Sequence, residues 1–196
     1  MKIGEVLALA GIAIGLILAL IILWKEEFKH YLAKDASDLE LNKFFEYDFL
    51  RIDQKPVFLH YFSQECKSAR VNIQHLQRIT EAYRNHFDFY VVKIGSLSNE
   101  EFSHKYNLPS YIKIISDTES DVASKHKVVA TPYALILTKE GQLIFKGNYT
   151  NQNGLCGPND IKWSAPAIAM KFISQSNKPP IFPPRQTRFW GCEIKP

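Results

Sequence analysis

The chain has 196 residues, of which 46% are hydrophobic and 22% charged, so it can form one globular domain with extensions and is too apolar to stay disordered. Its formal net charge is only +4, and it has no run of lysine and arginine interleaved with aromatic residues. These features argue against a nucleic-acid-binding surface, and no nucleic acid is expected as a partner.

An uncharged stretch, residues 6–24, follows a short N-terminal tail at residues 1–5. As a helix it would span roughly 28 Å, close to the thickness of a bilayer core. The alternative is a cleaved signal peptide, whose apolar region would be shorter and followed by a small-residue cleavage site. Here the stretch ends in Trp24, and Lys25, Glu26 and Glu27 follow instead. We therefore expect a transmembrane signal anchor in contact with membrane lipid.

The rest of the chain predicts a membrane-proximal helix and linker at residues 25–54, a domain at 55–176 and a proline-rich tail at 177–196 that should be extended. Within the domain we expect strands at 56–62, 87–94, 133–138 and 143–146, an extended piece at 111–115, and helices at 67–86, 99–106, 117–126 and 163–174. Strands alternating with helices and ending in a hairpin predict an α/β domain with parallel strands and an antiparallel edge.

Cys66 lies directly after the first predicted strand and at the start of the first predicted helix of this domain. A helix N-terminus offers free backbone N–H groups and the positive end of the dipole, and both stabilise a thiolate. Lys67 should reinforce this effect and Glu65 should oppose it. The position therefore favours a reactive thiol, and an inert, packed cysteine is the alternative.

Three segments, in this order, carry a family resemblance: the strand–cysteine–helix junction at 58–69, the stretch 101–123, and Val-Val-Ala-Thr-Pro-Tyr at 128–133 followed by Lys-Glu-Gly-Gln-Leu-Ile at 139–144. The chain resembles the thioredoxin-like superfamily, specifically the membrane-anchored thiol–disulfide oxidoreductases of bacterial envelopes. The resemblance implies a thioredoxin-like fold, with a central mixed sheet flanked by helices, beside an N-terminal transmembrane helix.

The resemblance also implies roles for individual residues. Cys66 would be the nucleophile, Pro132 would follow a cis peptide bond, and Thr131 with Pro132 would bind the backbone of the substrate. The family carries Cys-x-x-Cys, however, and this chain has Ala69 in place of the second cysteine. The usual thiol that resolves a mixed disulfide is therefore missing from residues 66–69.

Two roles are open for Cys156, which the fold implied by the resemblance would place on the same edge as Cys66. Cys156 could act as a distant resolving cysteine. Alternatively, a Cys156–Cys192 disulfide could fasten the tail to the domain. An odd number of cysteines in an exported protein is compatible with both, because the three thiols could exchange.

Other chemistry is less favoured by the sequence. A metal site formed by Cys66 with His60 or His126 is not expected, because the chain lacks the short Cys-x-x-Cys or His-x-x-x-His spacing. No cofactor is expected. His75 is predicted on the surface of its helix.

The sequence therefore predicts thiol–disulfide exchange through Cys66 on exported protein thiols or small thiols. The location would be the periplasmic face of a bacterial inner membrane, in a single-pass protein. This orientation rests on the chemistry, because the lysines that follow the apolar stretch favour the opposite one. The alternative is a membrane-tethered binding or assembly factor that has kept the fold and lost catalysis. The sequence leaves open whether the protein is an enzyme.

Overall fold

The computed structural model describes residues 3–28, 31–36, 40–44, 55–149 and 161–194, and the chain forms two compact units, Met1–Tyr31 and Leu32–Pro196. The first contains helix α1 (Ile3–Phe28). In the part of the chain that the structure describes, no helix combines the length and apolarity needed to cross a membrane. The transmembrane helix expected at residues 6–24 is therefore not supported. Residues 25–54, expected to form a membrane-proximal helix and linker, contain strand β1 (Tyr31–Lys34) after the end of α1.

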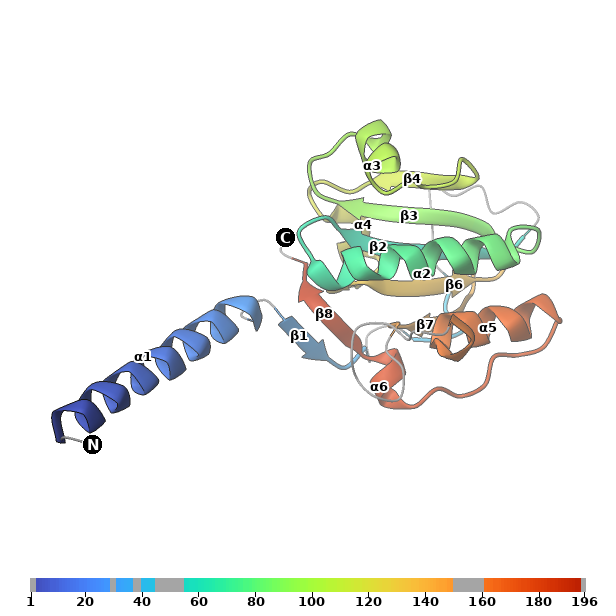
Figure 1. Ribbon diagram of the computed structural model, residues 1–196. Helices are drawn as coiled ribbons and strands as arrows, with labels where there is room; N and C mark the ends of the chain where they lie inside the picture. Colours follow the sequence, from blue (N-terminus) through green and yellow to red (C-terminus); the bar gives the residue numbers. More distant parts are fainter. Residues whose placement is uncertain (1–2, 29–30, 37–39, 45–54, 150–160, 195–196) are drawn as a thin grey trace. The chain divides into compact units, whose positions relative to one another are not determined.

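The second unit is built on a five-stranded sheet with the order β4-β3-β2-β6-β7 (Figure 1). Strands β2, β3 and β4 are parallel, whereas β6 runs antiparallel to both β2 and β7. The bounds are β2 (Val57–Ser63), β3 (Asp88–Ile94), β4 (Ile112–Ser116), β6 (Tyr133–Leu137) and β7 (Leu143–Gly147). The predicted strands are thus found within two residues of their expected bounds.

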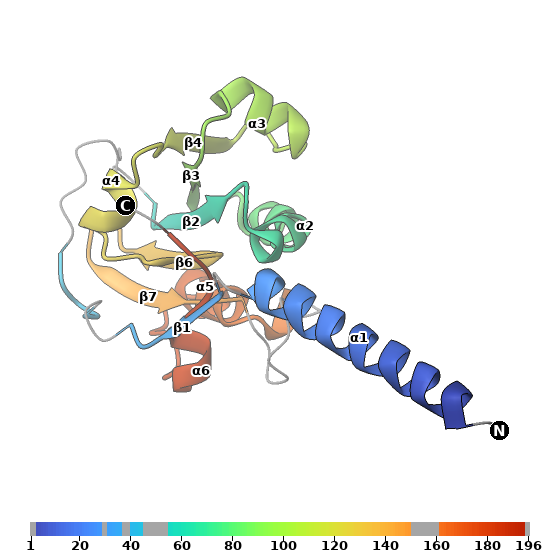
Figure 2. The same ribbon diagram turned by 90° about the vertical axis from the view of Figure 1, so that its left-hand side faces the viewer.

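Helices cover both faces of this sheet, as the sequence predicted. Figure 2 shows α2 and α3 on one side and α4 on the other. The bounds are α2 (Lys67–Tyr83), α3 (Asn99–Lys105), α4 (Asp121–Lys125) and α5 (Ala165–Ser174), with a 3₁₀ turn at Ile161–Trp163. Ser98 and Glu101 form a capping box at the start of α3. This central mixed sheet flanked by helices is consistent with a thioredoxin-like fold.

Alternating side chains of the central strands fill two separate cores. Phe58 and Phe62 of β2 point into the core shared with α2, α3 and α5, whereas Leu59 and Tyr61 point into the core shared with α4. A strand buried on both faces must be apolar at nearly every position, which explains the continuous apolar run of residues 57–62. His60 is the exception within that run, and it is fully buried.

A second, smaller sheet has the order β1-β8-β5, in which β5 is Ala130–Thr131 and β8 is Phe189–Glu193. The short helix α6 (Pro184–Thr187) precedes β8. The tail at 177–196 was expected to be extended, and the structure corrects this for residues 184–187, which form α6, whereas residues 189–193 are extended as β8. β8 lies beside the strand that ends at the Thr131–Pro132 bond, so the C-terminal segment meets the region that carries the predicted site.

Candidate functional site

Cys66 occupies the N-cap position of α2, directly after the turn that follows β2. Its backbone is extended (φ −81°, ψ 116°), and its carbonyl accepts the hydrogen bond from the Arg70 amide at 3.1 Å. The first turn of α2 carries no acidic residue, so no carboxylate of this turn offsets the positive end of the helix dipole near the sulfur. The local structure is thus the one that the sequence predicted for a nucleophilic cysteine.

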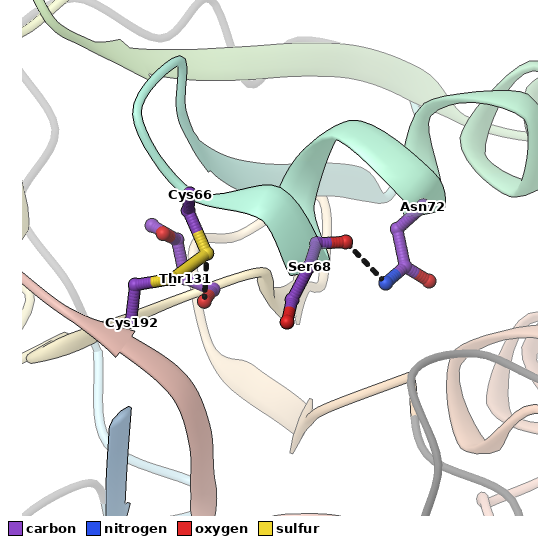
Figure 3. The surroundings of a disulfide bond; sticks show 5 residues. All are labelled: Cys66, Ser68, Asn72, Thr131 and Cys192. Atoms are coloured by element: carbon purple, nitrogen blue, oxygen red, sulfur yellow. Dashed lines mark hydrogen bonds between the residues drawn. A yellow bond between two sulfur atoms is a disulfide. The ribbon is translucent and has the colours of Figure 1, made fainter. Parts of the chain in front are cut away.

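The sulfur of Cys66 forms a disulfide with Cys192 of β8 (Figure 3). The two Cα atoms are 5.7 Å apart, within the range that disulfides usually span. The sequence suggested Cys156 as one possible partner of Cys192, and the structure instead pairs Cys192 with Cys66. Cys156 itself lies outside the described residues. Ala69, where a second cysteine of Cys-x-x-Cys would stand, is fully buried in the core under α2.

Thr131 and Pro132 lie against this disulfide, and the peptide bond between them is cis, as the resemblance implied. The carbonyl oxygen of Thr131 is 3.3 Å from Sγ of Cys66. In the disulfide that sulfur carries no proton, so the contact becomes a hydrogen bond only when Cys66 is a free thiol. The hydroxyl of Thr131 is buried and has no hydrogen-bond partner among the described residues.

Strand β8 pairs antiparallel with β5, so that Cys192 stands opposite Thr131 and Glu193 opposite Ala130. The amide of Ile194 adds a hydrogen bond of 2.9 Å to the carbonyl of Val129. The C-terminal strand therefore lies along the residues expected to bind a substrate backbone, and it places its own cysteine on Cys66.

Gly191 makes this close approach possible. Its φ is +149°, and a Cβ placed on it would lie 2.0 Å from the carbonyl oxygen of Thr131 and 3.2 Å from Cδ of Pro132. Both neighbours belong to the backbone or the proline ring, so neither can turn aside as a flexible side chain could. Only glycine fits where β8 crosses the Thr131–Pro132 bond.

The part of the tail before this crossing, residues 182–189, is held by packing, and we call it the anchored part. Phe189 is 2% exposed, and its ring lies 4.5 Å from that of Tyr133. The hydroxyl of Tyr133 donates to the carbonyl of Thr187, and the Phe182 ring meets Phe145 edge-on at 5.1 Å. These contacts involve neither cysteine.

Asn148, just after β7, fixes the anchored part further. Its side-chain amide donates to the carbonyls of Arg185 and Arg188, each at 2.8 Å. Its backbone amide donates to the carbonyl of Gln186 at 2.9 Å. One buried asparagine thus holds three carbonyls of the segment that leads to β8.

A buried polar cluster that the sequence did not predict lies beneath α2. Nδ1 of His60 and the hydroxyl of Tyr149 share a hydrogen bond of 2.6 Å, and Nε2 of His75 lies 2.9 Å from Oγ of Ser164. The Tyr149 ring packs edge-on against both histidines, at 5.2 Å and 5.7 Å. His75 was expected at the helix surface, and it is buried instead. His75 lies on the same face of α2 as Ile79, four residues on, which is also buried.

Burial controls the protonation of these groups. It lowers the pKa of His60 to about 3, with the charge of His75 as the second cause, and it raises the pKa of Tyr149. On the opposite face, burial followed by the charge of Lys125 lowers the pKa of His126 to about 4, and Nδ1 of His126 bonds the Tyr61 hydroxyl. His60 and His126 are therefore neutral in the folded protein at neutral pH. The cluster lies in the core, and the hydrogen bonds described above join its members to one another.

Comparisons with known proteins agree with this architecture. The chain is similar to an uncharacterised conserved protein from Geobacillus kaustophilus, with a TM-score of 0.65 at 16% identity over 84% of this chain and 96% of that one. It is also similar to a hypothetical protein from Sinorhizobium meliloti 1021, with a TM-score of 0.57 at 17% identity over 73% of this chain and 80% of that one. At such identities the likeness shows the fold alone.

A secreted Mycobacterium tuberculosis disulfide oxidoreductase homologous to E. coli DsbE also matches, at 16% identity over 63% of this chain and 81% of that one. Its TM-score of 0.42 is too low to support an argument about function. No curated protein matches the chain. A family model described as a domain of unknown function (DUF6436) matches residues 36–170. Cys66 and the Thr131–Pro132 bond fall within the matched residues, whereas Cys192 lies beyond them.

Proposed function

The chain belongs to the DUF6436 family, and we propose that it carries out thiol–disulfide exchange with Cys66 and Cys192 as its redox pair. The observation that carries the proposal is the disulfide between a cysteine at a helix N-terminus and a strand lying on the Thr131–Pro132 bond. In this scheme the second thiol has moved from the position of Ala69 to the C-terminal strand. Cys192, rather than Cys156, then resolves the mixed disulfide.

The reaction proceeds in two exchanges from the reduced protein. The Cys66 thiolate attacks one sulfur of a substrate disulfide, forms a mixed disulfide and releases the other substrate sulfur as a thiolate, which takes a proton from water. The Cys192 thiolate then attacks Sγ of Cys66, re-forms the Cys66–Cys192 bond and releases the remaining substrate thiol. Two electrons pass from the protein dithiol to the substrate, and oxidation of a substrate dithiol runs through the same steps in reverse.

The position of Cys66 at the N-terminus of α2 supports it as the attacking thiol, because the helix dipole stabilises a thiolate there. Cys66 is only 1% exposed while Cys192 is bonded to it. Reduction would let β8 withdraw and expose Cys66 to a substrate.

The test is the redox state of the three cysteines in buffers of graded glutathione potential, followed by alkylation and mass spectrometry. A catalytic pair should equilibrate with glutathione, and Cys66→Ala and Cys192→Ala should each abolish reductase turnover while Cys156→Ala retains it. Structural disulfides resist reduction until roughly −300 mV or lower. A Cys66–Cys192 disulfide that remains oxidised down to that potential would contradict the proposal.

That outcome would favour the second candidate, a binding or assembly factor without catalysis. The near-complete burial of Cys66 favours this candidate, because structural disulfides are usually shielded. In that case Cys192 would serve only to fasten the tail. Turnover measurements separate the two candidates. A binding factor whose tail is fixed by a structural disulfide should not raise the rate of substrate disulfide reduction above the rate with dithiothreitol alone.

The proposed setting is the periplasmic side of a bacterial inner membrane, with exported protein thiols or small thiols as substrates. The uncharged stretch at residues 6–24 supports the anchoring, and large apolar side chains of α1 such as Ile12, Leu18 and Trp24 are more than half exposed. Alkaline carbonate extraction tests it: the protein should stay in the membrane fraction, and Leu18→Arg should release it. Recovery of the unaltered protein in the soluble fraction would exclude the anchor.

A further inference from the structure

We propose that the reduced protein binds its substrate along residues 129–132 as an extended polypeptide segment in which glycine directly precedes the reacting cysteine. The proposal rests on the proposed function and names the substrate class of that site. The chain's own Gly191-Cys192-Glu193-Ile194 is the template, because it already occupies these residues with its cysteine bonded to Cys66. A substrate segment would take the same path once β8 has withdrawn.

Glycine is required by the distances at the crossing point. A Cβ at position 191 would lie 2.0 Å from the carbonyl oxygen and 2.8 Å from the carbonyl carbon of Thr131. The Thr131 backbone cannot yield easily, because it is buried and pairs with Cys192 on β8. Any segment that follows this path and brings a cysteine to Cys66 meets the same carbonyl one residue earlier. The site should therefore discriminate against a side chain at that position.

The residues after the cysteine contribute less selectivity. Ala130 pairs with Glu193 through the backbone, and Glu193 is exposed, so the structure places no demand on its side chain. The amide of Ile194 donates to Val129, and the Ile194 side chain is half-buried against the core shared with α4. The preferred pattern is thus glycine, cysteine, any residue and then an apolar residue.

Reduction removes the covalent link between β8 and Cys66. Besides β1, its other neighbour in the smaller sheet, the segment from Gly191 to Ile194 is held by the two-residue ladder with β5 and by the hydrogen bond from Ile194 to Val129. When the disulfide is reduced, this backbone pairing and the packing of the Ile194 side chain are left. The anchored part does not depend on the cysteines, so β8 remains tethered nearby and competes with a substrate as an intramolecular ligand.

Covalent capture tests the preference. The full chain carrying Cys156→Ser and Cys192→Ser has Cys66 as its only thiol. It is mixed with the peptide Phe-Trp-Gly-Cys-Glu-Ile or Phe-Trp-Ala-Cys-Glu-Ile, each with glutathione disulfide-bonded to its cysteine. Attack by the Cys66 thiolate on the peptide sulfur forms the protein–peptide disulfide and releases glutathione as its thiol. Mass spectrometry follows the adduct, and rates with dithiothreitol correct for any intrinsic difference between the peptides.

We expect the glycine peptide to be captured at least about tenfold faster, which corresponds to about 1.4 kcal/mol. Equal corrected rates for the two peptides, or no adduct with either while a small aromatic disulfide still reacts at Cys66, would overturn the docking inference and leave the proposed function intact. No reaction of Cys66 with the peptides or the small disulfide would instead overturn the proposed function.

A variant of the intact chain gives an independent result. Gly191→Ala should shift the equilibrium of the Cys66–Cys192 bond with glutathione toward the reduced form by roughly tenfold, because the bonded path is blocked. The melting temperature measured in dithiothreitol shows whether the reduced domain is still folded and should match that of the unaltered protein. An unchanged glutathione equilibrium in Gly191→Ala would show that the crossing point tolerates a side chain, and the inference would be lost.

Discussion

Residues 182–189 and residues 190–194 belong to one C-terminal segment, but different interactions hold them against the domain. The anchored part, residues 182–189, is fixed by the burial of Phe189 and by the hydrogen bonds of Asn148. The following residues, which we call the terminal part, are held by pairing with β1 and β5 in the smaller sheet and by the disulfide to Cys66.

This difference indicates how a redox pair can be built without Cys-x-x-Cys. The apolar packing of the anchored part keeps the terminal part close to Cys66 in both redox states. The Cys66–Cys192 disulfide joins the terminal part to Cys66, and reduction breaks this bond. Because Phe189 is only three residues from Cys192, the second thiol should remain at a high effective concentration after reduction. The predictions below separate the two parts, beginning with the largest expected effect.

Phe189→Ala should remove the anchor. Truncating a buried phenylalanine typically costs about 3–5 kcal/mol of unfolding free energy, and this ring also loses its contact with Tyr133. Urea unfolding should show the loss in both the reduced and the oxidised protein, since the contact involves no cysteine. Phe172→Ala on α5 is the matched control, because that ring is 36% exposed, and it should lose much less. A loss confined to the oxidised form would show that packing does not hold this part independently.

Cys192→Ser should remove the disulfide to Cys66 and leave the packing of the anchored part in place. The disulfide joins residues 126 positions apart. Cross-links of such length contribute about 2–4 kcal/mol, and the chain-entropy model gives roughly 5 kcal/mol as an upper value. Urea unfolding of the variant should therefore match that of the unaltered protein in dithiothreitol. A variant as stable as the oxidised protein would mean that the closed terminal part contributes nothing to stability.

The same division separates what the sequence could predict from what it could not. Apart from the two-residue strand β5, the strands and helices between residues 57 and 147 follow from local periodicity, as does the position of Cys66 before α2. The partner of Cys192 did not follow, because a disulfide over a long separation depends on where the tail returns to the domain. Gly191 and Phe189 were the available signals in the sequence. They could be interpreted only once the structure showed that the tail passes over Thr131. His60 was likewise visible only as one polar residue in an apolar strand.

Acid should lower the stability of the folded domain through His60. Because burial lowers the pKa of His60 to about 3, from about 6.5 in an unfolded chain, the unfolded chain binds an extra proton between these values. Stability is therefore complete above about pH 6.5 and falls as the pH drops toward 3. His60 should account for roughly 2.5 kcal/mol between pH 7.5 and pH 4.5. Its partner Tyr149 directly follows Asn148, so His60 belongs to the buried cluster beside the residue that holds the anchored part.

His60→Gln tests this directly. Glutamine can still bond the Tyr149 hydroxyl and does not titrate, so unfolding free energy measured across this pH range should flatten. His126 adds a similar dependence between about pH 6.5 and 4, and it should remain in the variant. His86→Gln, at an exposed position after α2, is the matched control for replacing a histidine by glutamine. An unaltered slope in His60→Gln would show that this histidine is not the group that titrates.

Ile194→Ala should have the smallest effect, and it should act only on the terminal part. The side chain is half-buried, and its backbone bond to Val129 survives the substitution. Removing its apolar surface should therefore cost less than about 1 kcal/mol. Because this contact forms only when β8 is closed, the loss should appear as a shift of the glutathione equilibrium toward the reduced form, by a few-fold, with no change in the melting temperature of the reduced protein. Glu193→Ala, which removes an exposed side chain from the same strand, should shift neither quantity. A lower melting temperature of reduced Ile194→Ala would mean that the terminal part stays docked without its disulfide, and the division of the tail into a permanent and a releasable part would not hold.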